Sequence, residues 1–260
     1  MSTGMVCTYA ELDALGEALR LDVRVFPFDV GHHGPTRRER LTVVVEAHRG
    51  LAARGLVREG EFAPELVESL RLLAGGRVAV ALVGTSGEDR PVALAVADDR
   101  SGLLAVGGDT SITFHRRHPD AVVPALVDLL PAVRPGPGSP VTLANAVPPA
   151  RDQDEDFADF RFTGTRRPAA RSARAAVEDI LRRPRVGAGY FVVTADGADR
   201  GALSFLDTDL GGYAVLPGVD GGGAQSVTYA PADRPALVRH LSRLAGTGPA
   251  VPPTGRSPWR

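Results

Sequence analysis

The pattern of hydrophobic and polar positions in the first 60 residues predicts two amphipathic helices, each preceded by a capping box. Thr8 and Glu11 can each satisfy a free backbone N–H of the other, and leucines at helical spacing follow them. Thr36 and Glu39 repeat the box before a longer helix that ends near Gly55, and a β-rich segment over residues 23–28 separates the two helices. We expect the second helix to bury one apolar stripe, which consists of Leu41, Val44, Val45, Leu51 and Ala52.

A third helix and a four-stranded meander follow. Pro64 suits the first turn of this helix, which we expect to end at the glycine pair 75–76. Apolar residues then alternate with a period of two, which indicates strands joined by turns. The expected strands cover residues 78–82, 92–96, 103–106 and 110–115, and a helix over about 121–130 closes this half.

The second half of the chain repeats this order of elements. We expect a helix over residues 169–183, strands over 189–194, 201–206, 213–216 and 225–229, and a helix over 232–245. The two closing helices share the letters Pro-Ala-Leu-Val, at 124–127 and at 235–238. Such a repeat predicts an α+β fold built from an internally duplicated helix–four-strand antiparallel meander–helix unit.

These patterns predict one pseudo-two-fold domain over residues 1–246. Its two pseudo-repeats span about 60–132 and 168–246, and the N-terminal helices over 8–55 precede them. A linker over 133–167 contains the segment 134–140, whose dense proline and glycine support neither helix nor ladder. Residues 247–260 form a flexible C-terminal tail.

Composition narrows the class of protein without choosing a partner. The 260 residues are 43% hydrophobic and 23% charged with a net charge of -1, typical globular values with no basic excess for nucleic acid. All 30 basic residues are arginine, a codon signature of a GC-rich genome. A single cysteine, Cys7, allows no internal disulfide, and neither a leader nor a membrane-spanning segment is apparent. We therefore expect a cytoplasmic protein.

Asp207 and Asp209 are the strongest candidates for catalytic or metal-binding chemistry. Two carboxylates at a strand end could hold Mg²⁺ or act as a nucleophile pair in a metal-dependent enzyme. The favoured interpretation is a hairpin turn whose Asp side chains bond the backbone. No lysine, phosphate loop or second acidic cluster accompanies the pair.

The histidines and glycine-rich segments give weaker signals. The pairs His32-His33 and His115/His118 would form a poor zinc set with Cys7. The segment 84–87 lacks the spacing of a nucleophile elbow, and 218–223 does not lead into a helix. The sequence thus predicts no catalytic, cofactor-binding or metal-binding residue, no cofactor, and a protein that is not an enzyme.

Arginines at intervals along residues 169–185 raise the question of an acidic partner or RNA. No stacking aromatics interleave with them, and an acidic run over 152–159 precedes them. We interpret the stripe as a solvated helix face.

Several segments resemble the EspG family, the cytosolic chaperones of type VII (ESX) secretion in actinobacteria. The N-terminal likeness runs through residues 8–15, Phe26-Pro27, the helix within 36–60, and 64–74. The C-terminal likeness is the segment Leu-Asp-Thr-Asp-Leu-Gly-Gly-Tyr at 206–213, followed by 226–231 and the last helix. Family members often carry an arginine where this chain has Gly212.

The resemblance implies a chaperone that keeps a helical secreted protein soluble for export. The implied partner is a PE/PPE-like or WXG-type heterodimer, with no nucleic acid, no membrane insertion and a possible homodimer. No catalytic residues carry over, and no residue can be assigned to partner binding, although the turn at 85–90 and the sheet are candidates. The alternatives are the enzyme using Asp207 and Asp209, and a self-associating structural protein that pairs through a strand edge.

Overall fold

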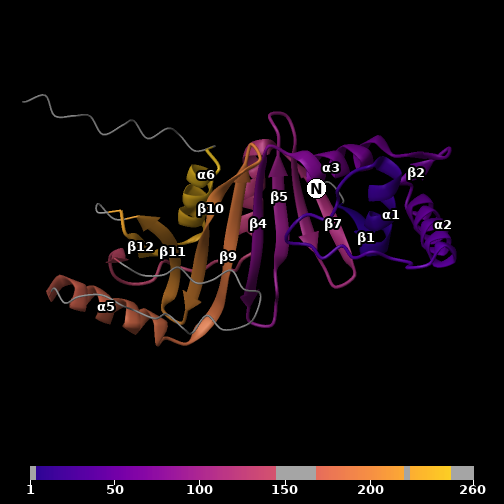
Figure 1. Cartoon of the computed structure of the whole chain (residues 1–260). Coiled ribbons are helices and arrows are strands. Elements are labelled where there is room, and N and C mark those ends of the chain that lie inside the picture. The colour runs from indigo at the N-terminus through magenta and orange to yellow at the C-terminus, as the bar shows by residue number, and fades with distance from the viewer. Residues whose placement is uncertain (1–3, 145–167, 220–222, 247–260) are drawn as a thin grey trace, which may run out of the picture.

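One large antiparallel sheet organises the chain, with helices on both of its faces (Figure 1). The computed structural model describes residues 4–144, 168–219 and 223–246. Along the chain the elements are β1 (Met5–Thr8), α1 (Tyr9–Leu19), α2 (Arg37–Ala53), β2 (Val57–Arg58), β3 (Glu61–Phe62), α3 (Pro64–Gly75), β4 (Val78–Ser86), β5 (Val92–Ala97), β6 (Gly102–Gly107), β7 (Ser111–Arg117), a 3-10 turn (Pro119–Ala121), α4 (Val122–Val127), β8 (Val141–Ala144), α5 (Pro168–Leu181), β9 (Arg185–Ala195), β10 (Ala198–Thr208), β11 (Gly211–Val219), β12 (Gln225–Pro231) and α6 (Arg234–Leu244).

Both capping boxes form as the sequence predicts. The Thr8 hydroxyl accepts a hydrogen bond from the Glu11 backbone N–H at 3.1 Å, and the Glu11 carboxylate accepts one from the Thr8 N–H at 2.8 Å. Thr36 and Glu39 make the same reciprocal pair at the start of α2. Each box satisfies two backbone donors that the first helical turn leaves free, so local sequence is sufficient to start these helices.

The β-rich segment over residues 23–28 forms no strand. Val23 and Phe28 are buried beside the helices, which explains why the segment is rich in apolar residues. The Phe28 N–H donates to the Val25 carbonyl at 3.0 Å, closing a turn around the cis Phe26–Pro27 bond. The segment therefore buries its apolar residues as a loop.

The buried stripe expected on α2 is also largely wrong. Only Ala47 and Leu51 of α2 are buried, whereas Leu41, Val44 and Val45 are exposed. The side of α2 that faces α1 is instead fixed by the ion pairs Arg40–Asp13 and Arg54–Glu11. The spacing of hydrophobic residues cannot predict such pairs.

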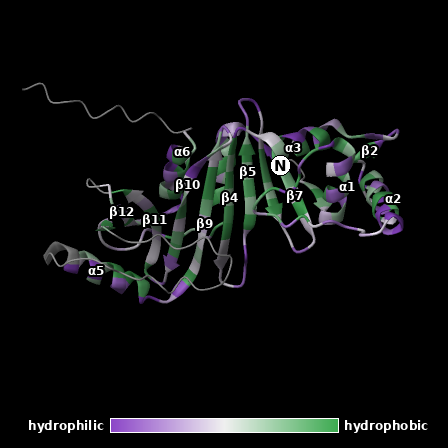
Figure 2. Ribbon diagram, in the orientation of Figure 1, coloured by the Kyte–Doolittle hydropathy of each residue, from purple (hydrophilic) through white to green (hydrophobic). Residues whose placement is uncertain are grey.

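The two meanders join edge to edge into one sheet. The strand order is β1-β7-β6-β5-β4-β9-β10-β11-β12-β8, and β4 pairs antiparallel with β9 from Val78↔Ala195 to Ser86↔Gly187. The central strands are strongly hydrophobic (Figure 2). Every backbone group on the inner edges of β4 and β9 can thus find a partner, which two separate meanders would leave unpaired.

The outermost strands were not expected. β1 pairs with β7 at one edge and β8 pairs with β12 at the other. Because β8 lies within the linker expected over 133–167, that segment is more than a connection. The remainder of the linker, 145–167, and the tail over 247–260 lie outside the described residues.

Helices cover the two faces of the sheet unequally. α4 and α6 pack together over Val80, Leu82, Phe191 and Phe205 on one face. On the other face, α3 covers β5 and β6, while α5 covers β8, β11 and β12 at the far end. No helix in the described residues is long and apolar enough to cross a membrane. The middle of the α3 face is left to strands and a loop.

Candidate docking groove

An apolar groove of about 600 Å³ occupies the middle of the α3 face of the sheet. Its floor consists of side chains from β4, β5 and β9, and the C-terminal end of α3 and the loop at Val25 and Phe26 form its walls. Such concave, mostly apolar surfaces with a few polar groups are typical of binding sites. The groove therefore becomes the candidate functional site.

The floor of the groove comes from both halves of the chain. Ala81 of β4 is the cross-strand partner of Val192 on β9, and Ala79 is the partner of Thr194. The small alanine side chains leave room above the strands, while Val192 and Tyr190 are only half-buried. An apolar side chain of another protein could occupy that room and bury further surface there.

Phe26 forms an exposed apolar rim of the groove. Its side chain lines the groove and is 46% exposed, a high value for a large aromatic residue. A ring in this position can cover an inserted side chain at small entropic cost, since few torsions become fixed. Phe26 belongs to the segments that carry the family resemblance, but no sequence pattern indicates its role at the groove.

Gly76 allows α3 to end close against the sheet. A Cβ atom on this glycine would lie 2.1 Å from Val96 Cγ1, far inside van der Waals contact. The Gly76 N–H donates to the Leu72 carbonyl at 2.9 Å and ends the helix there. The glycine stop therefore places the α3 wall directly beside the groove floor.

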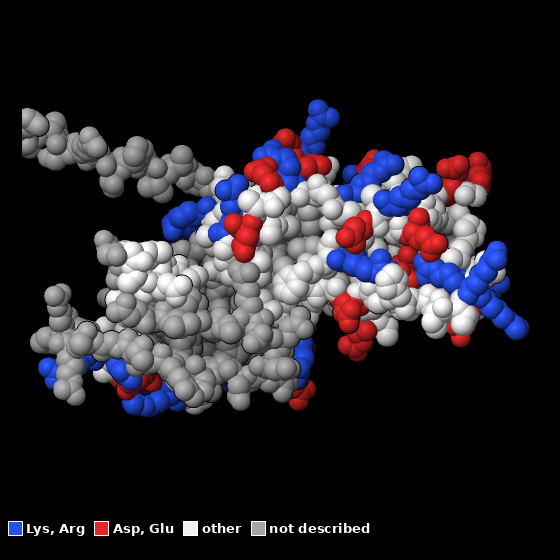
Figure 3. Space-filling model, viewed as in Figure 1, with Lys and Arg blue, Asp and Glu red and all other residues white. Residues whose placement is uncertain are grey.

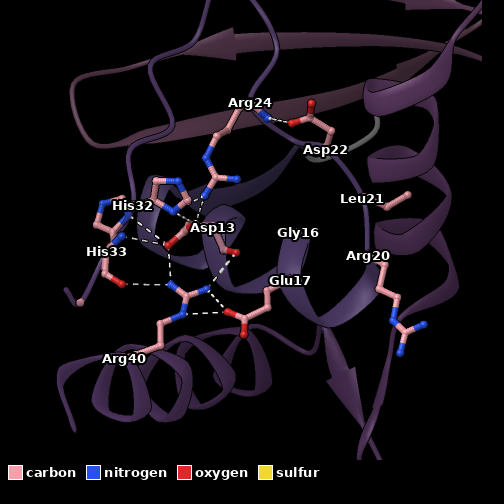
Figure 4. A pocket seen from close by; sticks show the side chains of 11 residues that line it. Asp13, Gly16, Glu17, Arg20, Leu21, Asp22, Arg24, His32, His33 and Arg40 are labelled. Carbon is pink, nitrogen blue, oxygen red and sulfur yellow. Dashed lines mark hydrogen bonds and ion pairs between the residues drawn. The ribbon is translucent and has the colours of Figure 1, made fainter. Parts of the chain in front are cut away.

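A second, polar cavity of about 670 Å³ lies between α1, the loop after it and α2 (Figure 4). The carboxylate of Asp13, which is almost fully buried, lies at its centre and pairs with Arg24 and Arg40. Arg40 Nε also donates to Glu17 at 2.8 Å, and the His33 N–H donates to Asp13 at 3.0 Å. These contacts tie the loop and both helices together.

Charge is stabilised within this cluster. Burial alone would raise the pKa of Asp13, but the hydrogen bonds from the His33 backbone and Arg40 and the charges of Arg40 and Arg24 hold it below its usual value. The pKa of Arg40 is raised by Glu17 and Asp13, against the opposing effect of burial. Asp13 and Arg40 are therefore both charged at neutral pH, and we interpret the cluster as structural.

The structure places His32 and His33 in this cluster. His32 Nδ1 lies 2.9 Å from Arg24 Nη2, and His33 Nδ1 lies 3.6 Å from an Asp13 oxygen. The described residues contain no group of three His, Cys, Asp or Glu side chains that could hold a metal ion. The pairing of Asp13 with Arg40 could not be predicted from the sequence, because the two residues lie 27 positions apart and neither belongs to a motif.

Asp207 and Asp209 do not converge on one site. Asp207 is buried on β10, whereas Asp209 is exposed in the two-residue turn that follows. Their expected role in the hydrogen bonds of the turn is wrong, because the Thr208 hydroxyl donates to the Gly211 carbonyl at 2.9 Å and accepts from the Leu210 N–H. Burial raises the pKa of Asp207 to about 6.

Gly212 leaves no space for the arginine that family members often carry. A Cβ atom there would lie 2.7 Å from the Ala232 carbonyl oxygen and 2.9 Å from Asp207 Oδ1. Across the strands, Asp207 has Gly187 on one side and Gly212 on the other. The buried carboxylate thus lies between two glycines.

Cys7, His115 and His118, which were weighed as metal ligands, each lie in surroundings that the fold itself explains. Cys7 is fully buried, and burial followed by the Glu11 charge raises the pKa of its thiol to about 12. His118 Nδ1 accepts from the Asp120 N–H at 3.4 Å at the start of a short turn. Burial and Arg117 lower the pKa of His115.

Arg174 of α5 and Arg182, just after the helix, pair with a glutamate of α5. Glu178 bonds Arg174 at 3.0 Å and Arg182 at 3.1 Å, one helical turn away on either side. Val177, which precedes Glu178, is fully buried and belongs to the same apolar cluster as Tyr229 and Leu143. The acidic run over 152–159, which was expected to neutralise the charge of these arginines, lies outside the described residues.

The turn at 85–90 is a tight hairpin away from the groove. Ser86 and Asp89 exchange two backbone hydrogen bonds, and the Gly87 N–H donates to the Val186 carbonyl at 3.1 Å. None of residues 85–90 lines the groove. The two candidate regions for partner binding are therefore separate surfaces.

Comparisons with known proteins identify relatives over nearly the whole chain. The model of the EspG family matches residues 8–243. Among solved structures, the chain is similar to the type VII secretion system chaperone EspG5 of Mycobacterium tuberculosis, solved in complex with the PE25–PPE41 dimer. That similarity has a TM-score of 0.60 and 14% identity, and covers 95% of this chain and 97% of that chain. No curated protein matches the sequence.

Proposed function

This chain belongs to the EspG family, and from that membership we propose that it is a cytosolic chaperone of type VII secretion. It binds a helical secreted protein, a PE/PPE-like or WXG-type heterodimer, and keeps that client soluble for export. The observation that carries the proposal is the apolar groove at the junction of the two halves. The likeness to EspG5, which was solved with the PE25–PPE41 dimer, supports the class of client.

The groove suits the tip of a helical hairpin. A helix tip presents a few apolar side chains at its end, and the alanines of β4 leave space for such anchors. Phe26 can close over an anchor from one side, and Asp199 and Thr194 provide polar contacts at the edge. Binding there would shield from water the apolar surface that makes a free client aggregate.

We propose that the described chain is one shared domain with an internal pseudo-two-fold relation. The strand order supports this proposal. Outward from the central β4–β9 pair, one side of the sheet continues β5, β6, β7 and the other continues β10, β11, β12, so each meander follows its chain order. The repeats then correspond to about 60–132 and 168–246 within a domain over 1–246. Because the groove floor needs both β4 and β9, neither half could bind a client alone.

Affinity purification of the tagged chain from its own cytosol, followed by mass spectrometry, tests the function. We expect a helical protein at stoichiometric level that is also found in the culture medium. Phe26→Asp and Val192→Glu should each reduce recovery of that client about tenfold or more, because they place charge on an apolar contact. Val219→Glu, an exposed apolar position outside the groove, is the matched control.

Circular dichroism and thermal melting must first show that all three variants are folded. A client retained by both folded groove variants would contradict the groove as the binding site. The absence of any secreted helical client would contradict the chaperone function itself.

Co-expression of two fragments, 1–144 and 145–260, tests the shared domain. Each fragment leaves one long central strand edge unpaired, so we expect each to be insoluble alone and soluble in the mixture. Independent folding of either fragment would contradict the proposal of one domain.

A further inference from the structure

The outer face of α2 carries an apolar stripe that is exposed in the described structure. Leu41 is 60% exposed, Val45 53% and Val44 41%. Their spacing of three and four residues places them together on one side of the helix. Single exposed apolar residues are ordinary, but three large ones on one helix face form a patch that needs an explanation.

Ion pairs hold α2 in the rotation that exposes this stripe. Arg40 pairs with Asp13, and Arg54 pairs with Glu11, and both carboxylates belong to α1 and are buried. The two arginines lie about four turns, or about 21 Å, apart along α2. Turning α2 to bury the stripe would leave the buried Glu11 without its arginine and the buried Asp13 with Arg24 as its remaining cation. Removing one partner from a buried ion pair is strongly destabilising, which opposes that rotation.

Arginines border the stripe. At 100° per residue, Arg38 and Arg49 fall along one edge of the stripe, about 16 Å apart, and Arg37 lies at its N-terminal end. None of these three side chains forms an ion pair with a described residue. Figure 3 shows basic side chains gathered at the end of the molecule that α2 occupies.

We propose that the outer face of α2 is a second docking surface, which binds an amphipathic helix of another protein whose apolar stripe is edged by carboxylates. Apolar residues at helical spacing fit the apolar face of a partner helix. Two carboxylates three turns apart on that helix would meet Arg38 and Arg49, for which no described residue supplies a counter-ion.

Other occupants fit this surface less well. A second copy would present the same arginine-edged stripe, and its Glu46 falls on the other side of the helix from Val44. An anionic membrane surface favours bulky aromatic residues at the interface, and the α2 stripe has none. Charge complementarity therefore points to an acidic protein helix.

The α2 surface is independent of the groove. The groove is lined by β4, β5, β9, β10, the end of α3 and the loop at Phe26, and no residue of α2 contributes to it. Both surfaces can thus be occupied together, so that the chain could hold one protein in the groove and a second at α2.

Fluorescence anisotropy of the full chain with two designed peptides tests this inference. Both are 18-residue helical peptides with the same leucine stripe, and the stripe is edged by glutamates 11 residues apart in one and by lysines in the other. We expect saturable binding of the glutamate peptide, about tenfold or more tighter than that of the lysine peptide, and weaker in 0.5 M salt. Val45→Glu should abolish this binding, and Arg38→Glu with Arg49→Glu should reverse the preference.

The matched control is Val219→Glu, which places the same charge on an exposed apolar position of β11 and should leave binding unchanged. Equal binding of both peptides, no saturable binding of the glutamate peptide, or binding insensitive to Val45→Glu would overturn the proposal. A dimer that Val45→Glu dissociates in light scattering would instead assign the surface to a second copy. Preferential binding to vesicles of anionic phospholipid would assign it to a membrane.

Discussion

Arg40 of α2 donates hydrogen bonds to both the buried carboxylate and the backbone carbonyl of Asp13 on α1, 27 residues earlier in the chain. This contact joins the two N-terminal helices and determines which side of α2 faces inward. It also explains why the most apolar stripe of α2 is on the outside. The stability of the N-terminal region should therefore depend on this pair.

Arg40→Ala should lower the free energy of unfolding by about 2–3 kcal/mol, because it leaves the buried Asp13 with Arg24 as its remaining cation. Chemical denaturation measures the change. Arg37→Ala, on an exposed arginine of the same helix, is the control and should change the free energy by less than about 0.5 kcal/mol. Equal effects of the two substitutions would show that the contact between Arg40 and Asp13 does not contribute to the free energy of unfolding.

The pH dependence of stability should report Asp207. Its folded pKa of about 6 lies above the unfolded value of 3.8, so the folded protein binds the proton more tightly. Its contribution is complete below pH 3.8 and is lost as the pH rises through 6. We expect the free energy of unfolding to include a gain of about 1 kcal/mol from this group between pH 7 and pH 5.

Asp207→Asn should remove that gain, and denaturation at pH 7 and pH 5 measures it. Asp209→Asn is the control, because Asp209 is exposed in the turn and should leave the pH profile unchanged. A wild-type pH profile in the folded Asp207→Asn protein would show that another group titrates in this range.

Two adjacent glycines offer a test of the packing at the groove wall. Gly76→Ala should destabilise the protein by about 1–3 kcal/mol, because the new Cβ would overlap Val96 at the floor of the groove. Gly75→Ala has open space around its Cβ position and should be neutral or slightly stabilising. Thermal denaturation of the two variants compares them, and a more stable Gly76→Ala protein would refute the close approach of α3.

The thiol of Cys7 should be inert in the folded protein. With a pKa of about 12 and no exposed surface, it is neutral and inaccessible at pH 8. A chromogenic disulfide reagent should modify it about a hundredfold or more slowly in the native state than in guanidinium chloride. Rapid native-state modification would mean that β1 separates readily from the sheet edge.

Much of the local structure is readable from the sequence. The capping boxes at Thr8 and Thr36 fix two helix starts, because both partners lie within one turn. Alternation of apolar residues identified eight strands of the central sheet, since a strand with one buried face has a period of two. The loop conformation of residues 23–28 could not be predicted in this way, because buried apolar residues outside helices and strands follow no regular spacing.

The candidate site was not readable in the same way. Ala81 and Val192 are cross-strand partners although 111 positions separate them, and no local pattern specifies that pairing. Phe26 is at the rim of the groove only because its loop passes the end of α3. The family resemblance, by contrast, spans the chain and suggested the class of function without identifying the surface.

By itself, the sequence determined the starts of the capped helices, the eight strands of the two meanders and the family to which the chain belongs. Capping, periodicity and motif order are properties of neighbouring residues, whereas the edge strands β1 and β8 were not expected. The tertiary structure decided that β4 pairs with β9, that Arg40 reaches Asp13, and that Leu41 and Val45 face outward. These outcomes depend on long-range contacts that compete for the same surfaces, and leaving a buried carboxylate without its arginine is strongly destabilising. Both the groove and the α2 surface follow from that competition.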